Sequence, residues 1–239
     1  MLEKDILEKY DETPIYGYLP KERTKFCDQE LFGEGLWKYV ILRKIKLWYG
    51  SPKSGDEKLK DKCVLGIQCV YQDLKTGNIK TTEQYCGELS ADDIEVKELE
   101  LKNNDYFNKF NIDYDCVIYH LKFTTRKGEL IEVGNETEFT KKTVLMNDLD
   151  DVMIHSFVGC YNTYGLRTLG CKYIKRKDFI YIHFLGFLRL RHLFIINDEE
   201  RKKWEDPKEL SKLSIEMKAI AKLCNFPDEN FISVLKYLI

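Results

Sequence analysis

The sequence predicts a mainly β protein, an antiparallel sandwich, barrel or prism, with an arm before it and a helical extension after it. Short runs of alternating apolar and polar residues, separated by turn residues, fill positions 31–176, and no parallel α/β pattern occurs. From residue 179 onward the apolar spacing becomes helical. We therefore divide the chain into an N-terminal arm (1–30), a β domain (31–178) and a C-terminal extension (179–239).

The arm begins with a helix candidate around Leu2, Ile6 and Leu7. It continues into TPIYGYLPKE, residues 13–22, where two prolines and a glycine favour an extended path. We expect that a segment this short does not fold by itself.

The first strands of the β domain lie at 40–50 and 63–73. The first is rich in β-branched and aromatic residues and ends at Gly50. In the second, odd-numbered positions from Cys63 to Tyr71 place apolar side chains on one face. A Gly-Asn turn then leads into IKTTEQYCG, which ends at Gly87.

The later strands include CVIYHLKFTT, which ends at Thr125 and is expected to place Val117, Tyr119, Leu121 and Phe123 on one face. The turn RKG then leads into ELIEVG. The last two strands are DVMIHSFVGC and LGCKYIK, joined by a loop at 161–168 that carries two exposed tyrosines.

The extension contains DPKELSKLSIEMKAIAKLC, whose apolar residues recur at helical spacing after the N-cap Asp206 and Pro207. A second helical stripe follows Pro227, and both stripes must be buried against something. The apolar run 179–196 has the length of a membrane span, but it contains two arginines and two histidines, so we expect no membrane span.

Charge and composition exclude several classes of function. The 239 residues carry a net charge of -2, which gives no general attraction to nucleic acid or anionic membranes. The first residues are charged every few positions and contain no signal-peptide core, so we expect an intracellular protein, cytoplasmic or cytoskeleton-associated. The eight cysteines include no CxxC pair, which favours reduced thiols.

No residue pattern predicts catalysis. Cys160 lies five positions after His155, so the two would point to opposite faces of a strand. The four histidines are scattered, and NDLDD at 147–151 lacks the glycine and glutamate of a calcium loop. No phosphate-binding loop occurs, and KYIKRK at 172–177 is interpreted as a solvated strand end. We therefore expect no enzyme activity, metal, cofactor or nucleic-acid partner.

Four segments, taken in order, resemble the jacalin-like lectin family, whose fold is a β-prism of three antiparallel sheets. FGEGLWKYVILRKIKLWYGS is similar to the family's glycine-rich opening and first long strand, with Gly33 and Gly35 at the glycine pair. VLGIQCVYQDLKTGNI resembles a strand that ends in a tyrosine and a turn, and residues 94–134 resemble the acidic stretch and next strand. IHSFVGCYNTYGLRTLGCKY resembles the family's ending, I.GF.G......LD.LG.Y.

The resemblance implies a monosaccharide pocket at one end of the prism, in which a loop aspartate accepts hydrogen bonds from sugar hydroxyls. Aligning GLRTLG on LD.LG places Arg167 where that aspartate is expected, and no Asp or Glu occurs from Ser156 to Lys177. An acceptor-only side chain is thus replaced by a donor-only one. The candidate binding residues are Gly33, Gly35, Tyr161, Asn162, Tyr164 and Arg167.

Two functions follow as hypotheses. The first is a non-enzymatic, intracellular protein-interaction or structural subunit of a larger assembly, because the usual aspartate is absent and both ends of the chain carry apolar faces. Arginine and tyrosine at this loop would suit a protein interface. The alternative is a carbohydrate-binding lectin of altered specificity that uses Tyr161, Asn162 and Tyr164.

Overall fold

The structure is a computed structural model. It describes residues 10–33, 39–52, 61–74, 76–89, 93–102, 105–135, 141–145, 152–176 and 178–179. The chain divides into two compact units, 1–176 and 177–239, and the described residues belong almost entirely to the first. The predicted helical extension, apart from its first residue, lies outside the described residues, as does Gly35.

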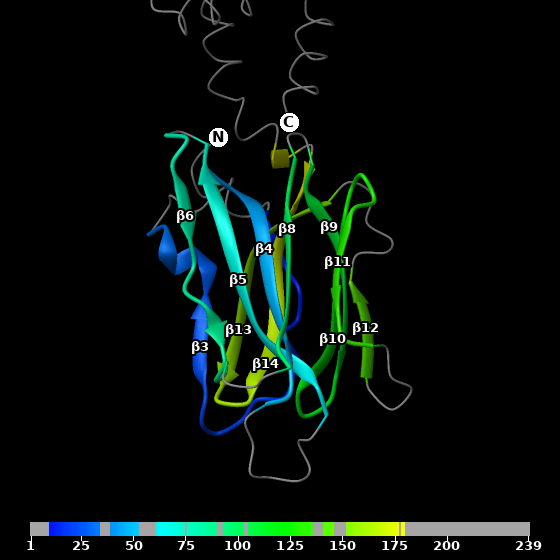
Figure 1. Cartoon of the computed structure of the whole chain (residues 1–239). Helices are drawn as coiled ribbons and strands as arrows, with labels where there is room; N and C mark the ends of the chain where they lie inside the picture. Colours follow the sequence, from blue (N-terminus) through cyan, green and yellow to red (C-terminus); the bar gives the residue numbers. More distant parts are fainter. Residues whose placement is uncertain are drawn as a thin grey trace, which may run out of the picture. The chain divides into compact units, whose positions relative to one another are not determined.

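The described residues form three antiparallel sheets, as the sequence predicts (Figure 1). The first sheet has the order β1-β14-β13-β3, with β2 also paired to β14: β1 (Tyr10–Glu12), β2 (Tyr16–Gly17), β3 (Thr24–Cys27), β13 (Val152–Asn162) and β14 (Gly165–Lys175). The second has the order β6-β5-β4-β8, with β7 beside β5: β4 (Val40–Gly50), β5 (Cys63–Asp73), β6 (Ile79–Thr81), β7 (Tyr85–Cys86) and β8 (Glu95–Glu100). The third has the order β11-β10-β9-β12: β9 (Phe107–Tyr114), β10 (Ile118–Thr125), β11 (Leu130–Val133) and β12 (Lys141–Leu145).

Part of the predicted arm contributes three short strands, β1, β2 and β3, to the first sheet. Tyr10 pairs with Ile174 of β14, and Phe26 pairs with Gly159 of β13. A single 3-10 turn, η1 (Asp28–Leu31), follows β3. The boundary placed after residue 30 stays a prediction, although the strands on its N-terminal side share a sheet with β13 and β14.

One large core lies between the three sheets, and aromatic rings meet at its centre. The ring of Phe123 in β10 lies 5.4 Å from that of Phe157 in β13, between centroids. Phe107 and Phe110 of β9 lie 5.9 and 5.6 Å from Phe123. Apolar residues of all three sheets therefore bury one another, which removes their surface from water.

A second, smaller core contains Trp48, Cys63, Leu65 and Val117. It exists because the expected single faces of β5 and β10 are interrupted by irregular register. The pairing of β4 with β5 shifts between Trp48 and Tyr49, and that of β10 with β9 shifts between Ile118 and His120. A bulge moves later side chains to the other face. The prediction of one continuous face from Val117 to Phe123 is therefore wrong.

Candidate ligand-binding site

The hairpin of β13 and β14 carries four of the predicted site residues, Tyr161, Asn162, Tyr164 and Arg167. The strands pair from Val152 and Lys175 to Asn162 and Gly165, and only Thr163 and Tyr164 lie in the turn between them. The expected loop over 161–168 is therefore wrong, because residues 165–168 continue the ladder as the start of β14. The turn lies at the lower end of the molecule in Figure 1.

Asn162 and Gly165 explain why the turn forms here. The Asn162 side chain accepts a hydrogen bond from the Tyr164 amide at 3.1 Å, an interaction that favours turns. Gly165 has a φ of +128°, and a Cβ at this position would lie 2.8 Å from the Val64 carbonyl oxygen. Glycine is needed both for the left-handed backbone and for the close approach to β5.

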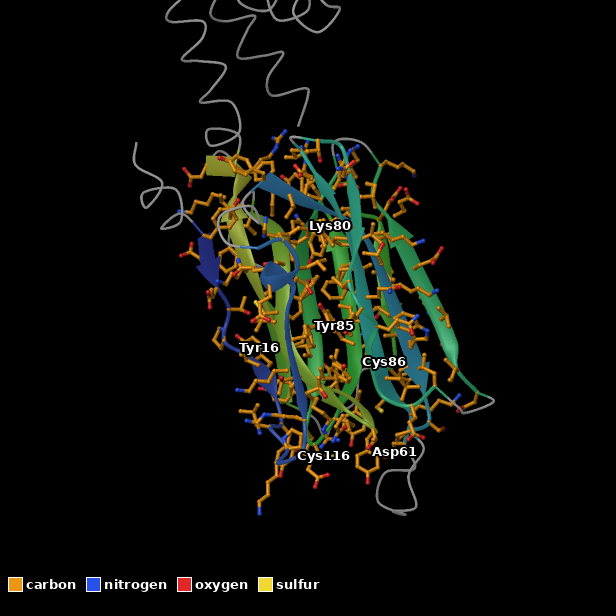
Figure 2. All side chains as sticks on the ribbon, turned by 90° about the vertical axis from the view of Figure 1, so that its left-hand side faces the viewer. Tyr16, Asp61, Lys80, Tyr85, Cys86 and Cys116 are labelled. Carbon is orange, nitrogen blue, oxygen red and sulfur yellow. The ribbon has the colours of Figure 1, made fainter. Side chains whose placement is uncertain are left out.

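A pocket of about 500 Å³ opens beside this turn. Its lining comes from three segments that are far apart in the sequence: residues 22–24 before and at the start of β3, residues 86–88 at and after the end of β7, and residues 161–164. The Glu88 amide donates to the Thr163 carbonyl at 3.1 Å, and the Gly87 amide donates to Leu65 at 3.0 Å. Cys86 marks this region in Figure 2.

Gly87 lets the segment after β7 reach the hairpin. A Cβ on Gly87 would lie 2.6 Å from the Gly165 nitrogen and 2.6 Å from the Thr163 carbonyl oxygen. Such distances do not allow a side chain, so this backbone contact depends on glycine.

Aromatic packing fixes the wall of the pocket. The rings of Phe26 and Tyr85 are stacked with centroids 4.1 Å apart, and Tyr161 lies 6.5 and 6.3 Å from them. Tyr161 is half-buried against the core while it also lines the pocket. Burial raises the pKa of the Cys86 thiol, so this pocket residue is neutral at pH 7.

Two carboxylates line the same pocket, Glu22 and Glu88. The sequence places neither near the hairpin, because one precedes β3 and the other follows β7. The pairing of β3 with β13 brings Glu22 close to Tyr161. The hydrogen bond from the Glu88 amide to the Thr163 carbonyl brings Glu88 close to Tyr164. Carboxylate acceptors are thus present at the site, although the hairpin itself contains no Asp or Glu.

Arg167 does not line this pocket. Its side chain is 5% exposed, and its guanidinium carbon lies 5.6 Å from the centre of the Tyr18 ring. The Tyr18 amide donates to the Arg167 carbonyl at 3.2 Å. Of the predicted residues, Tyr161, Asn162 and Tyr164 are brought together, and Arg167 lies on the same hairpin beneath Tyr18.

Gly33 lies away from the hairpin turn. It follows η1, where the Leu31 carbonyl is 3.4 Å from the Lys80 ammonium. Figure 2 places Lys80 toward the end of the molecule opposite Cys86. Gly33 has a φ of +76° and open space around its Cα, so its role here is a backbone turn. Its predicted membership of the site stays a prediction.

A second, more apolar pocket of about 410 Å³ lies on the outer face of the first sheet. Its lining includes Ile15, Leu19, Phe26 and Val158. Leu19 is 60% exposed and Tyr18, beside it in the chain, is 53% exposed. Segment 15–24 therefore contributes to both pockets.

Among the described residues, no group of three His, Cys, Asp or Glu side chains is placed to hold a metal ion. Within the same part of the chain, no helix is long and apolar enough to cross a membrane. Cys160 is buried and accepts a hydrogen bond from the Thr168 hydroxyl at 3.2 Å, which is a packing role.

Solved structures of jacalin-related lectins have the same fold. Malaysian banana lectin is 12% identical, and the match covers 70% of this chain and 99% of that one, with a TM-score of 0.50. Artocarpin complexed with methyl-α-mannose is 16% identical over 70% and 98%, with a TM-score of 0.50. A mannose-binding jacalin-related lectin from Ananas comosus is 13% identical over 70% and 99%, with a TM-score of 0.50. No protein-family model and no curated protein matches the sequence. The predicted β-prism fold is confirmed.

Proposed function

Because the chain has the β-prism fold of the jacalin-related lectins, we propose that it is a divergent member of that family and a non-enzymatic carbohydrate-binding module. The observation that carries this proposal is the pocket beside the turn of β13 and β14. It combines the tyrosines Tyr161 and Tyr164 and the amide of Asn162 with the carboxylates of Glu22 and Glu88.

These groups suit a sugar. Carboxylates accept hydrogen bonds from hydroxyls, and tyrosine rings offer an apolar face to the C–H side of a sugar ring. The Asn162 oxygen already accepts from the Tyr164 amide, so its NH₂ group is left to donate to a ligand. Two of the similar structures bind or contain mannose or its methyl glycoside, which supports the same ligand class here.

The proposed hydrogen-bond scheme differs from the one that the resemblance implies. Arg167, which the sequence alignment predicts at the aspartate position, is buried under Tyr18 and does not line the pocket beside the turn. Glu22 and Glu88 supply the acceptors from other segments. We therefore expect a specificity unlike that of the mannose-binding relatives.

The test is a glycan array followed by calorimetry on the full chain. We expect a millimolar or tighter ligand, and Glu88→Gln should weaken it about ten-fold because a hydrogen bond to a charged acceptor becomes a neutral one. Glu98→Gln on β8 is the matched control and should leave the affinity unchanged. Absence of binding to every sugar at millimolar concentration would rule the proposal out.

A second candidate function is a protein-interaction subunit of a larger intracellular assembly. It is favoured by the exposed apolar residues Ile15 and Leu19, which line the apolar pocket, and by the exposed Tyr18 next to Leu19 in the chain. Purification of the tagged protein from its native cell should then yield a defined complex. The double change Ile15→Ser and Leu19→Ser should release the partners, and an unchanged complex would count against this surface.

A further inference from the structure

Two of the three guanidinium nitrogens of the buried Arg167 lack an acceptor among the described residues. Its Nε and Nη1 atoms are inaccessible to water and donate no hydrogen bond to any residue that the structure describes. A guanidinium carries five N–H donors and keeps its charge at any physiological pH. Buried charges in proteins are normally paired, because removing an ion from water is strongly unfavourable.

The nearby thiol does not neutralise this charge. Burial raises the pKa of Cys63 to about 12, and the positive charge of Arg167 lowers that pKa only as a weaker effect. The thiol is therefore protonated at pH 7 and carries no negative charge. The π face of Tyr18, 5.6 Å away, is the group that faces the guanidinium.

Tyr18 is an exposed cover on this cation. More than half of its surface is accessible, and it follows a strand of only two residues, β2. Exposed side chains change rotamer on the picosecond to nanosecond scale. The backbone beneath it is more firmly placed, because Gly17 has a φ of +119° and lies against the Arg167 carbonyl. The ring can move while the backbone stays.

We propose that Arg167 binds the carboxylate of an acidic monosaccharide, which reaches the guanidinium when the Tyr18 ring turns aside. This inference rests on the proposed carbohydrate-binding function and names the ligand class. The planar guanidinium matches a carboxylate in shape and donors. A singly charged carboxylate also fits better than a phosphate dianion, since the pocket at the turn of the same hairpin is lined by two carboxylates, Glu22 and Glu88, and by one cation, Arg23.

Burying a guanidinium with two unpaired nitrogens is expected to lower stability, and a ligand explains such a group more readily than folding does. Sites where a chain departs from the ordinary rules of packing tend to be functional sites. Arg167→Leu should therefore raise the melting temperature of the ligand-free protein, because it replaces the unpaired charge by an apolar side chain of similar reach. A lower melting temperature would indicate that the guanidinium supports the fold and would overturn the proposal.

Calorimetry on the full chain tests the ligand class with D-glucuronate, its uncharged methyl ester and methyl-α-mannoside. We expect glucuronate to bind about ten-fold more tightly than the ester, and Arg167→Leu to abolish that difference. Arg126→Leu is the matched control, since Arg126 also lies over a tyrosine ring, that of Tyr106 at 5.9 Å, and it should keep the difference.

Tyr18→Ala provides a second, independent variant on the surface, where loss of folding is not expected. Removing the competing ring should strengthen glucuronate binding about two- to five-fold. If the ester and glucuronate bind equally, the inference fails while the carbohydrate proposal stands. If none of the three sugars binds at millimolar concentration, this inference fails, and the glycan array decides the carbohydrate proposal separately.

Discussion

Asp28 shows how a single residue makes this fold sensitive to pH. Its carboxylate is fully buried, and it accepts hydrogen bonds from the Tyr71 hydroxyl and, at 3.1 Å, from the Phe157 amide. Burial raises the pKa to about 6, and the hydrogen bonds from Tyr71, Phe157 and Tyr85 only partly oppose that rise. The native protein therefore binds this proton more tightly than the unfolded chain does.

The sign of the effect follows from the raised pKa. The contribution of Asp28 to stability is complete below its ordinary value near 3.8 and is lost as the pH rises to about 6. Two units of pKa correspond to about 3 kcal/mol. Asp28→Asn, which keeps the size and an acceptor oxygen, should remove this loss. Urea unfolding of the wild-type and Asp28→Asn proteins at pH 4 and pH 7 measures this loss of stability. An equal pH dependence of the unfolding free energy in the two proteins would contradict the prediction.

At the scale of elements, the turn between β13 and β14 decides where the pocket lies. Its geometry depends on the Asn162 oxygen, which accepts from the Tyr164 amide, and on Gly165. This turn also holds the segment after β7, because the Thr163 carbonyl accepts a hydrogen bond from the Glu88 amide. One polar side chain thus helps to position two walls of the pocket.

We predict that Asn162→Ala lowers the free energy of unfolding by about 1 kcal/mol, because the Tyr164 amide loses its acceptor. Asn162→Asp keeps the acceptor and should retain most of that stability. Both variants lose the NH₂ donors, so both should weaken any sugar that the amide contacts. Chemical denaturation and calorimetry separate the two effects. Equal stability of the alanine and aspartate variants would show that this hydrogen bond does not hold the turn.

The positions of the strands could be predicted from the sequence, but which side chains share a face of a strand could not. Likewise, the site residues on the hairpin could be predicted, but those from other segments could not. Alternation identified β5 and β10 because each is long and apolar, but the register shifts near Tyr49 and Ile118 are not visible in that pattern. Tyr161 and Tyr164 could be predicted because they are neighbours in the chain. Glu22 could not, since its position depends on the pairing of β3 with β13.

At the scale of the whole molecule, three sheets depend on one aromatic centre. Phe123 belongs to the third sheet, yet its ring contacts Phe157 of the first and is part of a core that includes Ile45 and Ile67 of the second. None of the sheets can bury its inner face alone. The prism should therefore unfold as one cooperative unit.

Phe123→Ala should lower the free energy of unfolding by about 3–5 kcal/mol, because the ring is fully buried and leaves a cavity. Phe123→Leu fills most of that space and should cost clearly less. Denaturant unfolding followed by fluorescence and by circular dichroism gives both values. Two separated transitions in the wild-type protein, rather than coincident curves, would contradict a single cooperative prism.

The end strand of the second sheet, β8, bears on the protein's tendency to aggregate. β8 reads EVKELE, is almost wholly exposed, and pairs with β4 along one edge. A free strand edge is a template on which another chain can add and begin to aggregate. Side chains with charges at Glu95, Lys97, Glu98 and Glu100 discourage that addition, because a flat apolar partner would have to desolvate them. The charged residues of the strand that ends the sheet are therefore expected to oppose fibre formation as well.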